Sequence, residues 1–179
     1  MKQSRGGAER DRKTRSDKKV AVAPNISDEY RVWIHRIARR LEIPEGIVGS
    51  RLVIAALEDE KCISFFRTYF RRAYQIQENH VMYPLFEPAN IYSFLDMGTD
   101  RHGRFKLKFS RNMAERLTEF QIALGVNFFA HAVKALLEYA LKEPIIVQKV
   151  APGIVFSDYQ KTLPVSKNNS NSDVWSIFK

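Results

Sequence analysis

The side chains with the clearest chemical potential are three basic residues at alternate positions, Arg104, Lys106 and Lys108, which Phe105 and Leu107 separate. Because successive side chains of a β-strand point to opposite faces, this run predicts a strand with an apolar inner face and a basic outer face. Arginine and lysine can donate hydrogen bonds to guanine O6 and N7, each good contact contributing about 1–3 kcal/mol of discrimination. A second interpretation is an ordinary amphipathic strand whose basic side chains are only solvated.

The segment after this strand would hold it in place. Ser110 lies where a helix N-cap belongs, because its hydroxyl can accept from backbone N–H groups that the first helical turn leaves without partners. Apolar residues spaced by 4, 3 and 4 positions predict one face of a helix of about 14 residues. They are Met113, Leu117, Phe120 and Leu124. The turn Leu124-Gly125-Val126-Asn127 then leads into a second helix that reaches Leu141.

The same pattern occurs once more, 83 positions earlier, so that Val22 corresponds to Phe105 and Ser27 to Ser110. The apolar face of the earlier helix consists of Tyr30, Ile34, Ile37 and Leu41. The joint match of strand parity, cap serine, helix phase and turn predicts a structural repeat, although two amphipathic helices can align by chance. By the same parity, the outward residues of the earlier strand are Lys19, Ala21, Ala23 and Asn25.

At these residues the chain resembles the ribbon–helix–helix family of DNA-binding proteins, the Arc and MetJ class. The stronger copy runs from Arg104 to Leu141, and the weaker copy runs from Val20 to Leu57 with the turn Leu41-Glu42-Ile43-Pro44. The resemblance implies a mainly α fold with a two-stranded antiparallel β-ribbon, arranged as a tandem pseudo-dimer with an extra linker helix. The weaker copy departs from the family in two places. Glu42 replaces the turn glycine, and Pro24, which cannot donate to a ladder, lies inside the strand.

The resemblance also implies which residues contact DNA. The ribbon would enter the major groove of double-stranded DNA, and the start of each second helix would bind a phosphate through backbone N–H groups and the helix dipole. The expected base contacts are Arg104, Lys106, Lys108, Asn25 and Lys19. The expected phosphate contacts are Asn127, Phe128, Lys134, Arg12, Lys13, Arg15 and Lys18. In the weaker copy, Pro44 lacks an N–H and Glu45 would repel a phosphate, so we expect the second copy to be the main DNA contact.

The remaining segments complete the predicted organisation. Residues 1–19 contain eight basic and three acidic groups of a chain with net charge +9, and they form either a disordered phosphate-binding arm or a solubilising tail. The predicted divisions are the arm 1–19, the first unit 20–60, a linker helix and irregular crossover 61–103, the second unit 104–142, and a partly disordered extension 143–179. In the linker helix, an apolar stripe is expected at Phe65, Phe66, Tyr69 and Ala73. In the extension, Pro144 should end the preceding helix, and Ile145-Ile146-Val147 and Gly153-Ile154-Val155-Phe156 should be short strands.

The sequence lacks the motifs that are typical of several classes of enzyme and metal-binding protein. The four histidines lack metal-binding spacing, Cys62 is the only cysteine, and neither a phosphate loop nor a nucleophile elbow occurs. We therefore expect no enzyme, metal or cofactor. Without a signal peptide or an apolar stretch near the ~20 residues of a membrane span, we expect a cytoplasmic protein that is nucleoid-associated when bound to DNA.

The function that the resemblance implies is a sequence-specific DNA-binding regulator, commonly a repressor, with double-stranded DNA and a second copy on adjacent DNA as partners. One alternative is an accessory protein of plasmid or conjugative DNA transfer, which would bind near a transfer origin. Another alternative is an antitoxin-like interaction protein, in which residues 143–179 would cover a protein partner.

Overall fold

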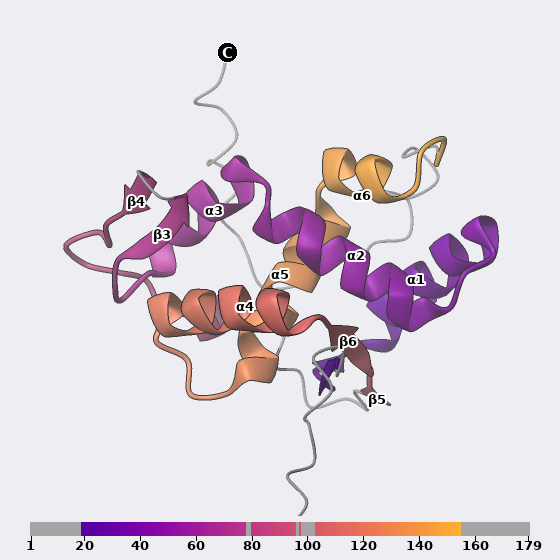
Figure 1. Cartoon of the computed structure of the whole chain (residues 1–179), viewed down its shortest axis with the longest axis horizontal. Helices are drawn as coiled ribbons and strands as arrows, with labels where there is room; N and C mark the ends of the chain where they lie inside the picture. Colours follow the sequence, from indigo (N-terminus) through magenta and orange to yellow (C-terminus); the bar gives the residue numbers. More distant parts are fainter. Residues whose placement is uncertain (1–18, 78–79, 96, 98–102, 155–179) are drawn as a thin grey trace, which may run out of the picture.

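The computed structural model describes residues 19–77, 80–95, 97 and 103–154 (Figure 1). This part of the chain is mainly helical, with three short antiparallel strand pairs. The helices are α1 Asp28–Leu41, α2 Glu45–Leu57, α3 Glu60–Phe66, α4 Arg111–Leu124, α5 Phe129–Lys142 and α6 Pro144–Val150. The strands are β1 Val20–Val22, β2 Asn25–Ile26, β3 Tyr74–Gln77, β4 His80–Met82, β5 Gly103–Arg104 and β6 Leu107–Phe109. Two 3₁₀ turns, η1 and η2, span Arg67–Tyr69 and Ile91–Ser93.

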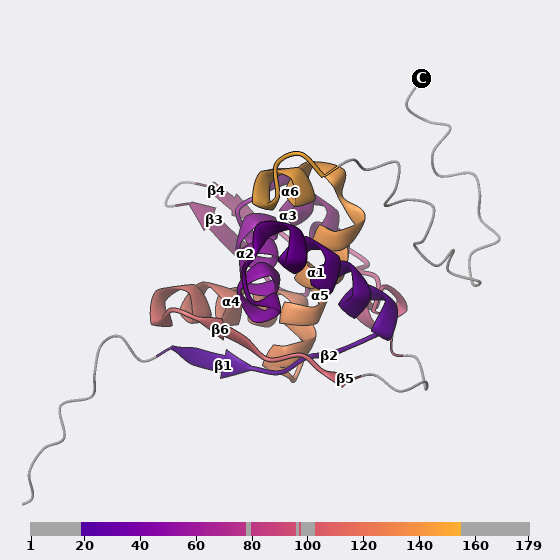
Figure 2. The same cartoon turned by 90° about the vertical axis from the view of Figure 1, so that its right-hand side faces the viewer.

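The strands of the two sequence copies pair with each other within one chain. β1 pairs with β6 and β2 with β5, both antiparallel and in a single register in which Ala21 lies opposite Lys108 and Asn25 opposite Arg104. Across the gap, this register places Ala23 opposite Lys106, which are equivalent residues of the repeat. The two strands are therefore related by a local twofold axis near that pair. We call β1, β2, β5 and β6 together the ribbon, and Figure 2 shows it along one side of the helices.

Pro24 divides the ribbon in two. Its strand is interrupted between Val22 and Asn25 and resumes in the same register. The N–H of Phe105 still donates to the Pro24 carbonyl at 2.9 Å, whereas the reciprocal bond is impossible because proline has no N–H. The interruption agrees with the expectation that Pro24 cannot donate to the strand ladder.

α1 and α4 are 14 residues long, as predicted, and each follows a serine. The Ser110 hydroxyl accepts from the N–H of Met113 at 3.3 Å, whereas Ser27 occupies the N-cap position without a side-chain hydrogen bond. Both helices end at a residue with positive φ, 68° at Gly125 and 53° at Glu42. Glycine has no Cβ to oppose this conformation, so the glutamate carries a cost that the glycine does not.

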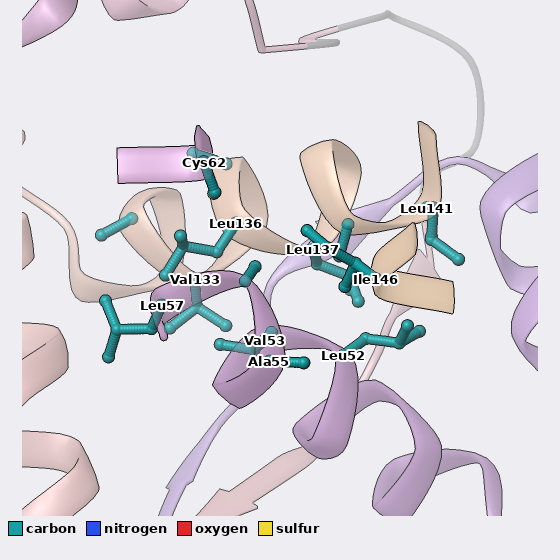
Figure 3. Close-up of a cluster of buried hydrophobic side chains, with 14 of the residues drawn as sticks. Leu52, Val53, Ala55, Leu57, Cys62, Val133, Leu136, Leu137, Leu141 and Ile146 are labelled. Carbon is teal, nitrogen blue, oxygen red and sulfur yellow. The ribbon is translucent and has the colours of Figure 1, made fainter. Parts of the chain in front are cut away.

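The core lies where α2 crosses α5. Figure 3 shows Leu52, Val53 and Leu57 of α2 facing Val133 and Leu136 of α5, with Cys62 of α3 and Ile146 of α6 at the sides. All of these side chains are at most 2% exposed. A helix that is apolar on most of its circumference is stable when it is buried on most sides, and α2 is such a helix. The inner face of the ribbon closes the core on another side with Ile26, Phe105, Leu107 and Phe109.

The segment between the copies differs from its prediction. The helix ends at Phe66 instead of continuing to Ala73 at the end of the predicted stripe, and the 3₁₀ turn η1 follows it. Of the aromatic residues from Phe65 to Tyr74, Phe66, Phe70 and Tyr74 are therefore buried, while Phe65 and the neighbouring Ala73 are exposed. The backbone N–H of Arg71 donates to the Ala123 carbonyl at 2.6 Å, which turns the chain away from a helical path at the end of α4. The hairpin of β3 and β4 then lies in a region that the sequence predicts to be irregular.

The segment after α5 also differs. α5 ends at Lys142 as predicted, but Ile145 to Val147 belong to α6 and are not a strand. Pro144 is the first residue of α6, where its missing N–H has no helical partner to lose and its φ suits a helix. Of the second predicted strand, Gly153 and Ile154 are not in a strand, and residues 155–156 lie outside the described residues.

No single helix in the described ranges has the length and apolarity to cross a membrane. α4 and α5 meet that test only as a pair, which is bent by 93° at the turn between them.

Candidate nucleic-acid interface

The ribbon has one buried face and one exposed face. Ile26, Phe105, Leu107 and Phe109 are at most 4% exposed, so the strand parity that the sequence predicts is the parity of the structure. The residues between them point away from the helices. We call this exposed set the outer face of the ribbon: Lys19, Ala21, Ala23, Asn25, Arg104, Lys106 and Lys108.

The outer face carries positive charge without a compensating acid. Each basic residue of the second copy lies opposite a small or neutral residue of the first, as Lys108 does with Ala21 and Arg104 with Asn25. Of the ion pairs among the described residues, none includes Arg104, Lys106 or Lys108. These cations are therefore available to a polyanion, which such an uncompensated surface attracts over several ångströms.

α2 packs directly against one edge of the ribbon because two of its residues have no side chain. A Cβ on Gly46 would lie 2.9 Å from the Lys106 carbonyl oxygen, and a Cβ on Gly49 would lie 2.6 Å from Cε1 of Phe105. Both distances are shorter than real Cβ contacts, so α2 could not approach this closely with larger residues. The two glycines, three positions apart on one helix face, therefore determine how closely the ribbon packs against α2.

Ser50 completes this edge. Its hydroxyl oxygen accepts from the backbone N–H of Lys108 at 3.3 Å and lies 3.2 Å from the Lys108 carbonyl and 2.8 Å from the Gly46 carbonyl. The edge of a two-stranded ribbon leaves alternate backbone groups without strand partners, and Ser50 supplies one. Lys108 thus has a fixed backbone while its side chain remains exposed. Gly46, Gly49 and Ser50 are not among the residues predicted above, although small residues at i, i+3 and i+4 of a helix are a signal for close packing.

The opposite edge adjoins the start of α5. Asn127 and Phe128 are exposed in front of it, Phe128 by 63%, and the first turn of α5 contains no acid. A pocket of about 300 Å³ lies between this turn and the ribbon, and we call it the ribbon pocket. Its lining includes Asn25 and Arg104 from the ribbon, and Ala130, His131 and Lys134 from α5. The structure thereby brings together residues that the sequence analysis assigns separately to bases and to phosphates.

Lys134 is not where that analysis expects it. Its side chain is 4% exposed, and its Nζ lies 3.4 Å from Oε1 of Glu138, which is 1% exposed. A DNA backbone outside the protein cannot reach an ammonium group at this depth. The reason is that α5 is buried on almost its whole circumference, so a residue one turn beyond its start already faces the interior.

The start of α2 differs from the start of α5 in charge. Glu45 is in its first turn, and Oε1 of Glu45 lies 2.7 Å from Nδ1 of His35. Pro44, which has no N–H, occupies the position before it. The expectation that the first copy is the poorer site for a phosphate rests on these two residues and stays a prediction.

Arg31 is a basic residue beside the ribbon that the sequence analysis did not single out. It is exposed in the first turns of α1, and its Nη1 would lie 2.9 Å from a Cβ on Gly103. Gly103 pairs with Ile26 next to Arg104, so Arg31 extends the basic surface beyond one end of the ribbon. Of the other predicted phosphate contacts, Arg12, Lys13, Arg15 and Lys18 lie outside the described residues.

Burial shifts the pKa values of several titratable groups among the described residues. Burial raises the pKa of the Cys62 thiol, so Cys62 is neutral and a poor nucleophile at pH 7. Burial likewise raises the pKa of Tyr74 to about 12. Beside the ribbon, partial burial and then the charge of Lys134 lower the pKa of His131, which favours a neutral ring. Within the described ranges, no group of three or more His, Cys, Asp or Glu side chains is placed to hold a metal ion.

The chain matches no protein-family model, no curated protein and no solved structure.

Proposed function

We propose that this protein binds double-stranded DNA sequence-specifically by placing the outer face of the ribbon in the major groove. The observation that carries the proposal is the exposed row Arg104, Lys106 and Lys108, which stands on a paired strand, has no acid on its face and lies above a buried apolar face. A two-stranded ribbon fits the width of the major groove, and the guanidinium and ammonium groups are donors suited to guanine.

The spacing of the row supports this placement. Alternate side chains on a strand are about 7 Å apart, because the rise is about 3.3 Å per residue. Bases along one DNA strand are about 3.4 Å apart, so neighbouring residues of the row would meet every second base pair. Asn25, opposite Arg104, could hydrogen-bond to an adenine through its side-chain amide.

The arrangement of the elements supports a tandem ribbon–helix–helix pseudo-dimer as the framework. Each strand of the ribbon precedes two helices, and the strands of the two copies pair about a local twofold axis in one chain. A single unit would leave its apolar strand face and helices uncovered, whereas the two units together bury α2 against α5.

The proposed target site is asymmetric. The second copy contributes Arg104, Lys106 and Lys108 to the outer face, while the first contributes Ala21, Ala23, Asn25 and Lys19. Alanine can contact only a thymine methyl group, so the two halves of the ribbon would recognise unlike sequences.

We further propose that DNA binding serves transcriptional repression, a role that rests on the family resemblance. An accessory role in conjugative DNA transfer would use the same surface, and the neighbouring genes would distinguish the two.

The experiment that tests the proposal is selection of bound DNA from a random pool by the full-length protein, followed by footprinting. Enrichment of one non-repeating site that a single chain covers is the expected result. A palindromic site would indicate instead that two chains meet across a dyad. The absence of any enriched sequence would refute sequence-specific binding.

A further inference from the structure

The two edges of the ribbon differ because the two copies differ at three positions of their second helices. In α2 these are Gly46, Gly49 and Ser50, which allow the helix to lie against the strand and bond to its edge. The corresponding residues of α5, 83 positions later, are Phe129, Ala132 and Val133. Larger side chains and the loss of the hydroxyl prevent α5 from approaching its strand in the same way. The ribbon pocket occupies the space on that side.

The chemistry of the ribbon pocket favours an anion. Two cations, Arg104 and Lys134, are among its lining residues, together with the amide of Asn25 and the ring of His131, and none of the described lining residues is a carboxylate. The His131 ring is held in place from outside the pocket, because its Nδ1 lies 3.3 Å from the Tyr92 hydroxyl. A volume of about 300 Å³ is at the lower end of the range for small-molecule sites, which suits a metabolite and excludes a folded partner.

The pair of Lys134 and Glu138 gives the pocket a fixed cation. Burying two charges costs free energy that their attraction repays only partly, and an apolar pair of similar volume is often as stable. The equivalent positions in the first copy are Arg51, which is exposed, and Ala55, so the fold of the repeat does not require this pair. The pair holds the Lys134 ammonium at the pocket.

We propose that the ribbon pocket binds a small anion, a phosphate- or carboxylate-bearing metabolite, and that the bound anion opposes DNA binding. Arg104 and Asn25 belong to both the pocket and the outer face of the ribbon, so an anion that engages them withdraws two donors from the bases. The second half of this proposal rests on the DNA-binding function proposed above, whereas anion binding itself does not.

The first test uses the full-length protein without DNA and inorganic phosphate as the probe, with sodium chloride holding the ionic strength constant. The NMR titration of the His131 ring and thermal unfolding follow binding. We expect a saturable rise in the pKa of His131, because a nearby anion favours the protonated ring, and a saturable rise in Tm. A response that does not saturate, or an unchanged His131 pKa, would overturn the proposal.

Two variants locate the ligand. Ala130→Leu fills the pocket from the first turn of α5, and Lys134→Met combined with Glu138→Met replaces the whole pair without leaving one buried charge. The matched control is Arg51→Met, which removes the equivalent cation of the other copy. We expect phosphate binding to weaken about tenfold or more in both pocket variants and to be unchanged in the control. Equal binding by all of these proteins would place the anion elsewhere and overturn the assignment.

The final test adds the DNA that the selection enriches, again at constant ionic strength because salt alone weakens such complexes. Phosphate should displace DNA from the wild type but not from Ala130→Leu, whose affinity for DNA should stay within about twofold of the wild type. A large loss of DNA affinity in Ala130→Leu would mean that the pocket receives a phosphate of the DNA itself, and would overturn the regulatory role. If the protein binds phosphate as described but binds no DNA, the proposed function is refuted, whereas the proposed anion site in the ribbon pocket still stands.

Discussion

Lys106 provides the sharpest test of the ribbon as a DNA-reading element. It is exposed at the centre of the outer face, opposite Ala23, and the neighbouring Gly46 holds its backbone against α2. Lys106→Ala removes the ammonium group and leaves the strand in place. Because the side chain is exposed, the free energy of unfolding should change by no more than about 0.5 kcal/mol.

The expected loss is in sequence discrimination. If the ammonium group donates to a base, its removal should cost about 1–3 kcal/mol at the enriched site, which is roughly a 5- to 150-fold weaker affinity. Binding to a scrambled duplex should weaken much less, since the lost contact is specific to a base. The dependence of affinity on salt should also change little, whereas the loss of a phosphate contact would lower the salt slope by about 1.

The assay is fluorescence anisotropy with the enriched and the scrambled duplex at several salt concentrations. Lys149→Ala is the matched control, because Lys149 is an exposed lysine on α6, which Figure 2 places on the opposite side of the molecule from the ribbon. An unchanged ratio of the two affinities in Lys106→Ala would refute the assignment of the outer face to base contacts. An equal effect of Lys149→Ala would reduce the role of Lys106 to general charge.

Three further predictions concern the flank of the ribbon, the residues that end α1 and α4, and the pKa of Glu143. Arg31→Ala should weaken specific and scrambled DNA equally and lower the salt slope by about 1, so a loss confined to the specific site would contradict a phosphate contact. Glu42→Gly should raise the free energy of unfolding in urea by about 1 kcal/mol, and Gly125→Ala should lower it, because both positions have positive φ. Burial, and then the charge of Asp59, raise the pKa of Glu143 above its ordinary value, so the native state binds the proton more tightly than the unfolded state. The wild type therefore loses stability as the pH rises through this pKa. The Tm of Glu143→Gln should exceed that of the wild type at pH 7 but not well below pH 4.5. A Tm difference that shrinks with rising pH would contradict this prediction.

The local features of each repeat follow from the sequence because they depend on neighbours a few residues away. Alternation determines that Phe105 is buried and Lys106 exposed, and the spacing of apolar residues determines the 14-residue helices. Glu42 and Gly125 occupy equivalent positions of the predicted repeat, and both have positive φ although Glu42 replaces the turn glycine.

Where local rules permit two outcomes, packing makes the choice. A proline can end a helix or begin one. Pro144 begins α6 because the helical conformation buries Ile146 and Val147 in the core. From the end of α3 onward, the buried aromatic residues are likewise Phe66 and Phe70 instead of the predicted stripe, since the chain turns toward the end of α4.

The sequence by itself determined the outer face of the ribbon, because the direction of a strand side chain is a property of two adjacent residues. Only the tertiary structure decided that Lys134 is buried and that the ribbon pocket lies beside it. Whether a helical residue faces solvent depends on which surfaces surround the helix, and α5 is buried on almost its whole circumference.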